Sequence, residues 1–73
     1  MTRLPQISGR ECARALEKVG FYVDRQKGSH IILMRDDPKA RVSVPNHRTL
    51  KPGTLRAILQ HADMTVEEFV ELL

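Results

Sequence analysis

FYVDRQKGSHIILMR, residues 21–35, sets two strand-like segments on either side of a glycine–serine pair. Residues 21–26 alternate between the two sides of an extended chain, as a half-buried strand does. Residues 31–35 are apolar almost throughout, which is typical of a central strand. Gly28 and Ser29 supply a short turn between the two segments. The stretch therefore predicts two neighbouring antiparallel strands.

A third strand and a first helix are predicted on either side of this pair. Residues 41–44 alternate again, between the turn chemistry of residues 36–39 and Pro45, which stops the strand. Ser8 and Glu11 fit a capping box that opens a helix, and Gly20 is placed to end it in the left-handed conformation. The apolar stripe of this helix is Cys12, Ala15, Leu16 and Val19.

Two more helices are predicted towards the C-terminus. Pro52 suits the first turn of the second helix, and a second capping box, Thr65 with Glu68, opens the short third helix. Their apolar faces are Leu55, Ile58, Leu59 and Ala62 in the second helix, and Val66, Phe69, Val70 and Leu73 in the third. After an extended lead-in over residues 1–7, the order α-β-β-β-α-α predicts a single α+β domain spanning residues 1–73. We expect its first two helices on one face of a three-stranded antiparallel sheet.

Strand parity predicts which side chains of the first strand face the helices. One side carries Phe21, Val23 and Arg25, and the other carries Tyr22, Asp24 and Gln26. We expect the side with Phe21 and Val23 to lie against the helices.

The central strand presents a choice between its two faces. We expect Ile31 and Leu33 to point inward, because that leaves the polar His30 off the helix-covered core. Ile32 and Met34 would then form an exposed apolar patch, which is a candidate docking surface for another protein.

Basic and acidic residues are separated along the chain. The 73 residues carry 12 Lys or Arg and 9 Asp or Glu, a formal net charge of +3. Residues 25–56 contain eight of the basic side chains and two acids, whereas residues 57–73 contain four acids and no Lys or Arg. This asymmetry predicts a basic surface in the middle of the chain and an acidic C-terminal helix.

Cysteine usage and hydropathy bear on the compartment and on metal binding. Cys12 is the single cysteine and can form no internal disulfide, so we expect a cytoplasmic protein. No apolar run approaches the roughly 20 residues of a membrane span. The three histidines have no metal-ligand spacing, so we expect neither a metal site nor a cofactor.

His30, at the mouth of the central strand, is the candidate catalytic residue. Because imidazole titrates near neutrality, it can take the 2′-hydroxyl proton of RNA and let that oxygen attack the adjacent phosphorus, with no metal required. Gly28 and Ser29 allow close approach of a nucleic-acid backbone and offer N–H groups to phosphate oxygens. Lys27 or Arg25 would offset the charge that grows on the phosphoryl oxygens.

A second acid or base is needed to protonate the leaving oxygen, and several candidates stay open. They are His47, Ser29, Lys27 and bound water. His47 belongs to a polar loop that also carries Arg48 and Lys51, which we expect to bind phosphates. His61 is expected in the second helix, exposed or near its C-terminus, and we expect no function for it.

Short motifs follow one another in a specific order. They are Ser8-Gly9-Arg10-Glu11, Gly20-Phe21, Arg25-Gln26-Lys27-Gly28-Ser29-His30, Val42-Ser43-Val44-Pro45-Asn46-His47, and Leu50-Lys51-Pro52-Gly53-Thr54-Leu55-Arg56 followed by Ile58-Leu59. In this order and spacing the chain resembles the HicA family of small bacterial and archaeal toxins, also described as mRNA interferases, over nearly its whole length. It departs from the family at Asp63, where a glycine often ends the second helix.

The resemblance implies a fold like that of double-stranded-RNA-binding domains and endoribonuclease activity towards mRNA. The family's catalytic histidine maps onto His30. The resemblance also implies a HicB-like antitoxin protein that binds the toxin and covers its active site, in a complex that we expect to be oligomeric.

Two alternatives to an RNA-cleaving toxin stay open. A non-catalytic module of the same fold would hold duplex RNA by phosphate and 2′-OH contacts, since three aromatic residues make no stacking platform. A protein-interaction domain would instead use the patch of Ile32 and Met34.

Overall fold

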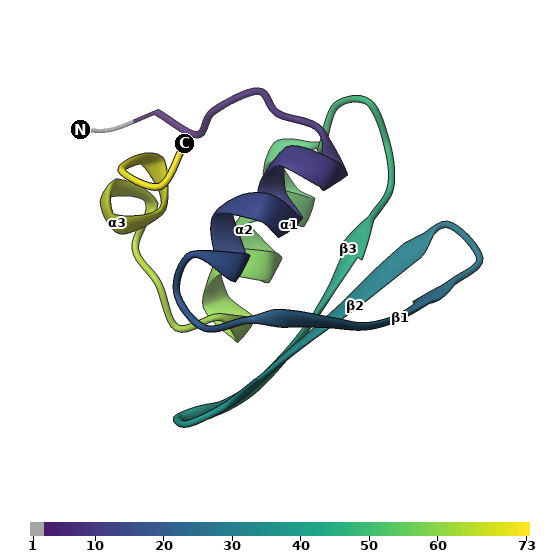
Figure 1. Ribbon diagram of the computed structural model, residues 1–73. Helices are drawn as coiled ribbons and strands as arrows, with labels where there is room; N and C mark the ends of the chain where they lie inside the picture. The colour runs from purple at the N-terminus through teal and green to yellow at the C-terminus, as the bar shows by residue number, and fades with distance from the viewer. Residues whose placement is uncertain (1–2) are drawn as a thin grey trace.

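A three-stranded antiparallel sheet, with helices packed on one face, forms the computed structural model of residues 3–73 (Figure 1). Met1 and Thr2, the start of the predicted lead-in, lie outside the described residues. The elements are α1 (Gly9–Glu17), β1 (Tyr22–Lys27), β2 (His30–Asp36), β3 (Lys39–Pro45), α2 (Pro52–His61) and α3 (Val66–Val70). The predicted α+β class and element order are confirmed.

Both predicted capping boxes are present. The Ser8 hydroxyl accepts a hydrogen bond from the Glu11 N–H at 3.1 Å, and the Glu11 carboxylate accepts one from the Ser8 N–H at 3.0 Å. Thr65 and Glu68 repeat this pair of bonds at the start of α3, at 3.1 and 2.9 Å. Helix α2 begins differently, because Lys51 at its N-cap makes no side-chain capping bond and Pro52 stands in its first turn.

Residues in the left-handed conformation follow the first two helices. Gly20 has φ 96°, as predicted for the end of α1. Asp63 has φ 58° after α2, and the N–H groups of Asp63 and Met64 donate to the carbonyls of Gln60 and Leu59. This is the hydrogen-bond pattern of a Schellman cap, so the helix end forms even though an aspartate stands where glycine is favoured.

The core lies between the helices and the inner face of the sheet. Its fully buried side chains are Cys12, Leu16, Leu33, Val42, Val44, Leu55 and Phe69. Ile31 joins the same cluster, so the predicted inward direction of Ile31 and Leu33 is confirmed. In the C-terminal segment Leu72 packs against the core, whereas Leu73 is exposed. Leu73, predicted on the apolar face of the third helix, lies beyond the end of that helix at Val70.

Strand β1 differs from the prediction in burial and in register. All of its residues are exposed, including Val23 at 48%. Val23 pairs with Leu33, but an irregularity follows, and Arg25 pairs with Ile32 while Gln26 pairs with Ile31. The extra residue of a bulge reverses the alternation. Arg25 therefore lies on the face opposite Val23, and the predicted grouping of Phe21, Val23 and Arg25 on one side was wrong.

The predicted exposed patch of Ile32 and Met34 was also wrong. Ile32 is 6% exposed and Met34 is half-buried, although no helix covers their side of the sheet. Strands flank both residues on each side, with Arg25 and Ser43 paired to Ile32. Neighbouring side chains, including the aliphatic stem of an arginine, remove much of the solvent contact of a central-strand residue.

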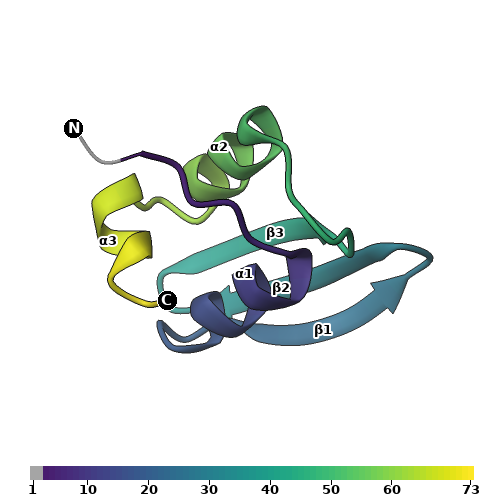
Figure 2. The same ribbon diagram turned by 90° about the horizontal axis from the view of Figure 1, so that it is seen from above.

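Helix α2 lies on the β3 side of the sheet, and α1 lies over the strands next to it (Figure 2). Within residues 3–73, none of the helices has the length and hydropathy needed to cross a membrane.

Candidate functional site

Several loops and helix starts converge at one end of the sheet. Lys27 pairs with His30 across the β1–β2 turn, and His30 pairs with Pro45 at the end of β3. The N–H of Asn46 donates to the Ser29 carbonyl at 2.6 Å, which fastens the loop of residues 46–51 to the turn. We call this end of the sheet, with the β1–β2 turn, loop 46–51 and the first turns of α1 and α2, the basic end.

Gly9 fixes this loop against α1. Its N–H donates to the His47 carbonyl at 2.9 Å, and a Cβ at this position would collide with the Pro45 carbonyl. Only glycine allows the backbone of α1 to approach the end of β3 so closely. The capping box of Ser8 and Glu11 was predictable from the sequence, but this packing role of Gly9 was not, because it depends on how closely β3 approaches α1.

His30 is exposed at the start of β2 and lines a hollow of about 420 Å³. Ser43 and Pro45 of β3 contribute to the same lining, and α2 contributes Gly53, Thr54, Ala57, Ile58 and His61. We call this space the His30 hollow. Both His30, the predicted catalytic residue, and His61 line it, although α2, which carries His61, starts 22 residues after His30.

His61 is the residue that sequence reasoning missed. It is the last residue of α2, and it follows Gly53 and Ala57 at intervals of four residues. That spacing puts the three on one side of the helix. The sequence shows this spacing, but it does not show that this side of α2 faces the hollow lined by His30.

None of the predicted phosphate-binding residues lines the His30 hollow. Lys27, Gly28 and Ser29 form the turn before His30, and Gly28 has φ 60° with open space where a side chain would be. His47, Arg48 and Lys51 are exposed in or beside loop 46–51, outside the lining of the hollow. The imidazole groups of His30 and His61 therefore line the hollow, whereas the predicted phosphate-binding cations lie outside its lining.

Arg25 is the one predicted phosphate ligand that already has an anionic neighbour. Its Nε lies 3.1 Å from the Asp24 carboxylate, and this is the only ion pair among residues 3–73. Lys27, Arg48 and Lys51 have no such partner in that range. Their charge stays available to an anion, whereas part of the charge of Arg25 is offset.

None of the residues with an altered pKa lines the His30 hollow. Burial raises the pKa of the Cys12 thiol to about 12, which removes this residue as a nucleophile. A hydrogen bond to Asp36 at 2.9 Å raises the pKa of the Tyr22 hydroxyl. Both residues of that bond lie at the other end of the β1–β2 ladder, where Tyr22 pairs with Met34.

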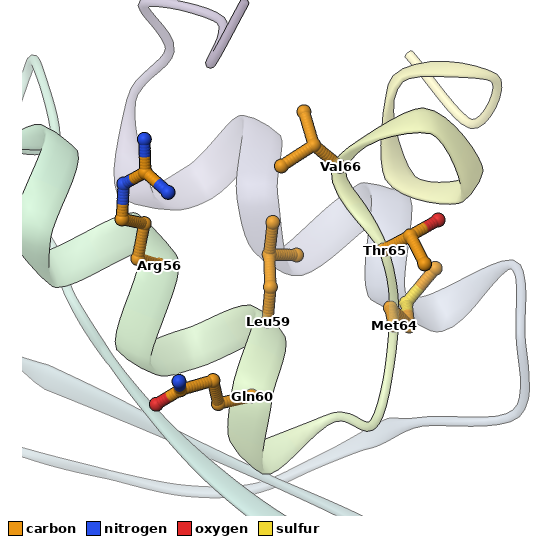
Figure 3. Close-up of a pocket in the computed structure, with 6 residues that line it drawn as sticks. All are labelled: Arg56, Leu59, Gln60, Met64, Thr65 and Val66. Carbon is orange, nitrogen blue, oxygen red and sulfur yellow. The ribbon is translucent and has the colours of Figure 1, made fainter. Parts of the chain in front are cut away.

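A hollow next to α3 offers less chemistry. It lies between α2 and the start of α3 and is lined by Arg56, Leu59, Gln60, Met64, Thr65 and Val66 (Figure 3). It contains no imidazole, carboxylate or thiol. No group of three His, Cys, Asp or Glu residues in the described part of the chain is arranged to hold a metal ion.

Comparison with known proteins gives one family match. The family described as the HicA toxin of bacterial toxin–antitoxin systems matches residues 9–64. That span runs from the first residue of α1 to three residues beyond the end of α2, and it contains every residue of the basic end named above. No curated protein matches the chain.

Proposed function

The chain belongs to the HicA toxin family of bacterial toxin–antitoxin systems, and we propose that it is an endoribonuclease that cleaves mRNA with His30 as general acid/base. The observation that carries the proposal is the position of His30. Its imidazole is exposed in a hollow large enough for part of a nucleotide chain, beside a turn that leaves space for a phosphate backbone.

The chemistry follows from imidazole next to a ribose phosphate. His30 accepts the proton of a 2′-hydroxyl, and the 2′-oxygen forms a bond to the adjacent phosphorus. The bond from phosphorus to the 5′-oxygen then breaks while a second acid or a water molecule protonates that oxygen, which leaves a 2′,3′-cyclic phosphate and a 5′-hydroxyl. Lys27, which pairs with His30 in the β ladder, is close enough to offset the negative charge that grows on the phosphoryl oxygens.

RNA binding rests on charge and backbone shape. Lys27, Arg48 and Lys51 supply exposed cations at the basic end, and the exposed turn residues Gly28 and Ser29 offer backbone N–H groups to phosphate oxygens. These contacts read no base, so they hold the RNA by its backbone. Arg25 takes part to a lesser degree because of its contact with Asp24.

The partner of this toxin is a HicB-like antitoxin that covers the basic end. Toxin–antitoxin pairing is a property of the family, and a neutralising protein must keep RNA away from His30. The antitoxin surface that does so should be acidic, because it faces Lys27, Arg48 and Lys51.

Replacing His30 tests the proposal directly. His30→Ala should lower the rate of RNA cleavage roughly 10²–10⁴-fold, the usual contribution of a general acid or base, and should end growth arrest in cells. The variant should keep its folding transition and its binding to the antitoxin, because His30 is exposed. Lys39→Ala is the matched control, since Lys39 is also the exposed first residue of a strand, at the other end of the sheet.

Three outcomes decide the matter. Cleavage in EDTA that leaves a cyclic phosphate supports attack by the 2′-oxygen. Unchanged cleavage by His30→Ala would remove His30 from the mechanism. Wild-type protein that shifts labelled RNA in a gel and leaves its length unchanged would make the chain a non-catalytic RNA-binding module.

A further inference from the structure

The His30 hollow contains two imidazole groups and no other titratable side chain among the described residues that line it. His30 comes from β2, and His61 comes from the last turn of α2. Cleavage by a 2′-oxygen needs two proton transfers, one from the nucleophile and one to the leaving oxygen. The His30 hollow holds one candidate group for each transfer.

The packing of α2 fixes the position of His61. Leu55, Ile58 and Leu59 are buried in the core and hold the helix in one orientation. The neighbouring side of the helix carries Gly53, Ala57 and His61 along the hollow. Because glycine and alanine are small, they leave the space in front of the imidazole free for a ligand.

The other polar groups near the hollow are either weaker acids or lie outside its lining. Ser43 and Thr54 line it, but a hydroxyl is a poor acid at neutral pH. Lys27 and His47 lie at the same end of the sheet but do not line the hollow. This leaves His61 as the group best placed to act opposite His30.

We infer that His61 is the second catalytic residue, the general acid that protonates the leaving 5′-oxygen of RNA; this inference rests on the proposed endoribonuclease function. Neutral His30 takes the 2′-hydroxyl proton as the bond from the 2′-oxygen to phosphorus forms. Protonated His61 gives its proton to the 5′-oxygen as the bond from phosphorus to that oxygen breaks. The products are a 2′,3′-cyclic phosphate and a 5′-hydroxyl, and the two imidazoles have exchanged protonation states, so no co-reactant is consumed.

This assignment makes a prediction about the leaving group. His61→Ala and His61→Gln should each slow cleavage of ordinary RNA roughly 10²–10³-fold, as expected when one general acid is lost. A substrate with sulfur in place of the 5′-oxygen leaves as a thiolate and needs no proton. On that substrate both variants should cleave within about tenfold of wild type. His30→Ala should remain slow on both substrates, because the 2′-hydroxyl proton must still be removed.

Gln60→Ala is the matched control. Gln60 is the preceding residue of α2 and is also exposed, but it lines the separate hollow between α2 and α3 (Figure 3). Its substitution should leave both cleavage rates unchanged, and thermal unfolding should show that all three variants at positions 60 and 61 fold.

The outcomes separate this inference from the proposed function. If His61→Ala cleaves ordinary RNA at the wild-type rate while His30→Ala does not, the inference is wrong and the proposed function stands. If His61→Ala is slowed by the same factor relative to wild type on the oxygen and sulfur substrates, His61 does not donate the proton and the inference is wrong as well. If the wild-type protein cleaves neither substrate, the proposed function itself fails.

Discussion

Cys12 is the most completely buried reactive group in the described chain. It has no exposed surface, and the residues around it belong to the apolar core. An anionic thiolate would be costly there, which is why burial raises the pKa of this thiol to about 12. Cys12 therefore acts as a small apolar side chain of α1.

The pKa of Cys12 predicts how stability depends on alkaline pH. A thiol whose pKa is about 9 when unfolded and about 12 when folded contributes a constant amount below pH 9. Above pH 9 the unfolded chain releases the proton and the folded chain retains it, so stability falls as pH rises. Between pH 9 and pH 11 the free energy of unfolding, measured with urea, should fall by about 2 kcal/mol from this residue alone.

Cys12→Ala supplies the reference for this measurement. The variant should be less stable at pH 8, because a buried side chain is shortened, but its stability should fall less steeply between pH 9 and pH 11. Parallel slopes for the two proteins would contradict the raised pKa of Cys12.

Single positions were predictable from the sequence when one local rule decided them. The preference for apolar side chains inward placed Ile31 and Leu33 correctly and put His30 on the other face. Asp63 shows the limit of such rules, since its conformation has φ 58°, which favours glycine. The packing around the end of α2 imposes that conformation on a residue whose own preference is weaker.

Two helices begin at the basic end, each with a glycine in its first turn, and the two glycines differ in their surroundings. Gly9 of α1 is buried against the carbonyl of Pro45. Gly53 of α2 is exposed, and a Cβ added there would meet no atom within 4 Å. The start of α1 is therefore sterically fixed, while the start of α2 is open.

This difference predicts opposite effects of the same substitution. Gly9→Ala should lower the free energy of unfolding by about 1–3 kcal/mol, because the new methyl group must displace the loop after β3. Gly53→Ala should raise it by about 0.5–1 kcal/mol, because alanine loses less backbone entropy than glycine in a helix. Urea denaturation of the two variants beside the wild type measures both values. Equal effects would mean that α1 does not approach Pro45 as closely as the structure has it.

Helices were easier to predict than strand faces for a physical reason. Each capping box joins residues three positions apart, so Ser8 and Glu11 define the start of α1 without help from the rest of the fold. The bulge of β1 depends instead on how Arg25 and Gln26 pair with β2. That pairing depends on tertiary contacts, which cannot be predicted from the alternation of apolar and polar residues along the strand.

At the scale of the whole molecule, the chain brings together groups that are distant in sequence. His30 and His61 are 31 positions apart, and each looks like an isolated histidine in the sequence. Both line one hollow because α2 packs on the β3 side of the sheet, next to the strand that pairs with β2. The fold class could be predicted from hydrophobic periodicity and turn residues. The proximity of His30 and His61 to one hollow could not, because it depends on the packing of α2.

The two turns of the sheet lie at opposite ends of β2 and carry different charges. The β1–β2 turn follows Lys27 and is hydrogen-bonded to the loop that carries Arg48, while the β2–β3 turn contains Asp37 and follows Asp36, the last residue of β2. Lys39, the residue after that second turn, is opposite Asp36 in the β2–β3 ladder. Because Asp36 and Asp37 repel phosphate, an RNA backbone should be attracted to the basic end rather than to the β2–β3 turn.

Salt dependence of RNA binding tests this polarity with two matched lysines. In the cleavage-deficient His30→Ala background, Lys27→Ala should weaken binding to single-stranded RNA and reduce the slope of log K against log salt by about 0.7, the value for one lost phosphate contact. Lys39→Ala removes the same charge at the other end and should leave the slope unchanged, because its neighbour Asp36 repels phosphate. Filter binding over a range of salt concentrations measures both slopes. Equal losses from the two variants would show that RNA responds to net charge alone, and the basic end would then have no privileged role in binding.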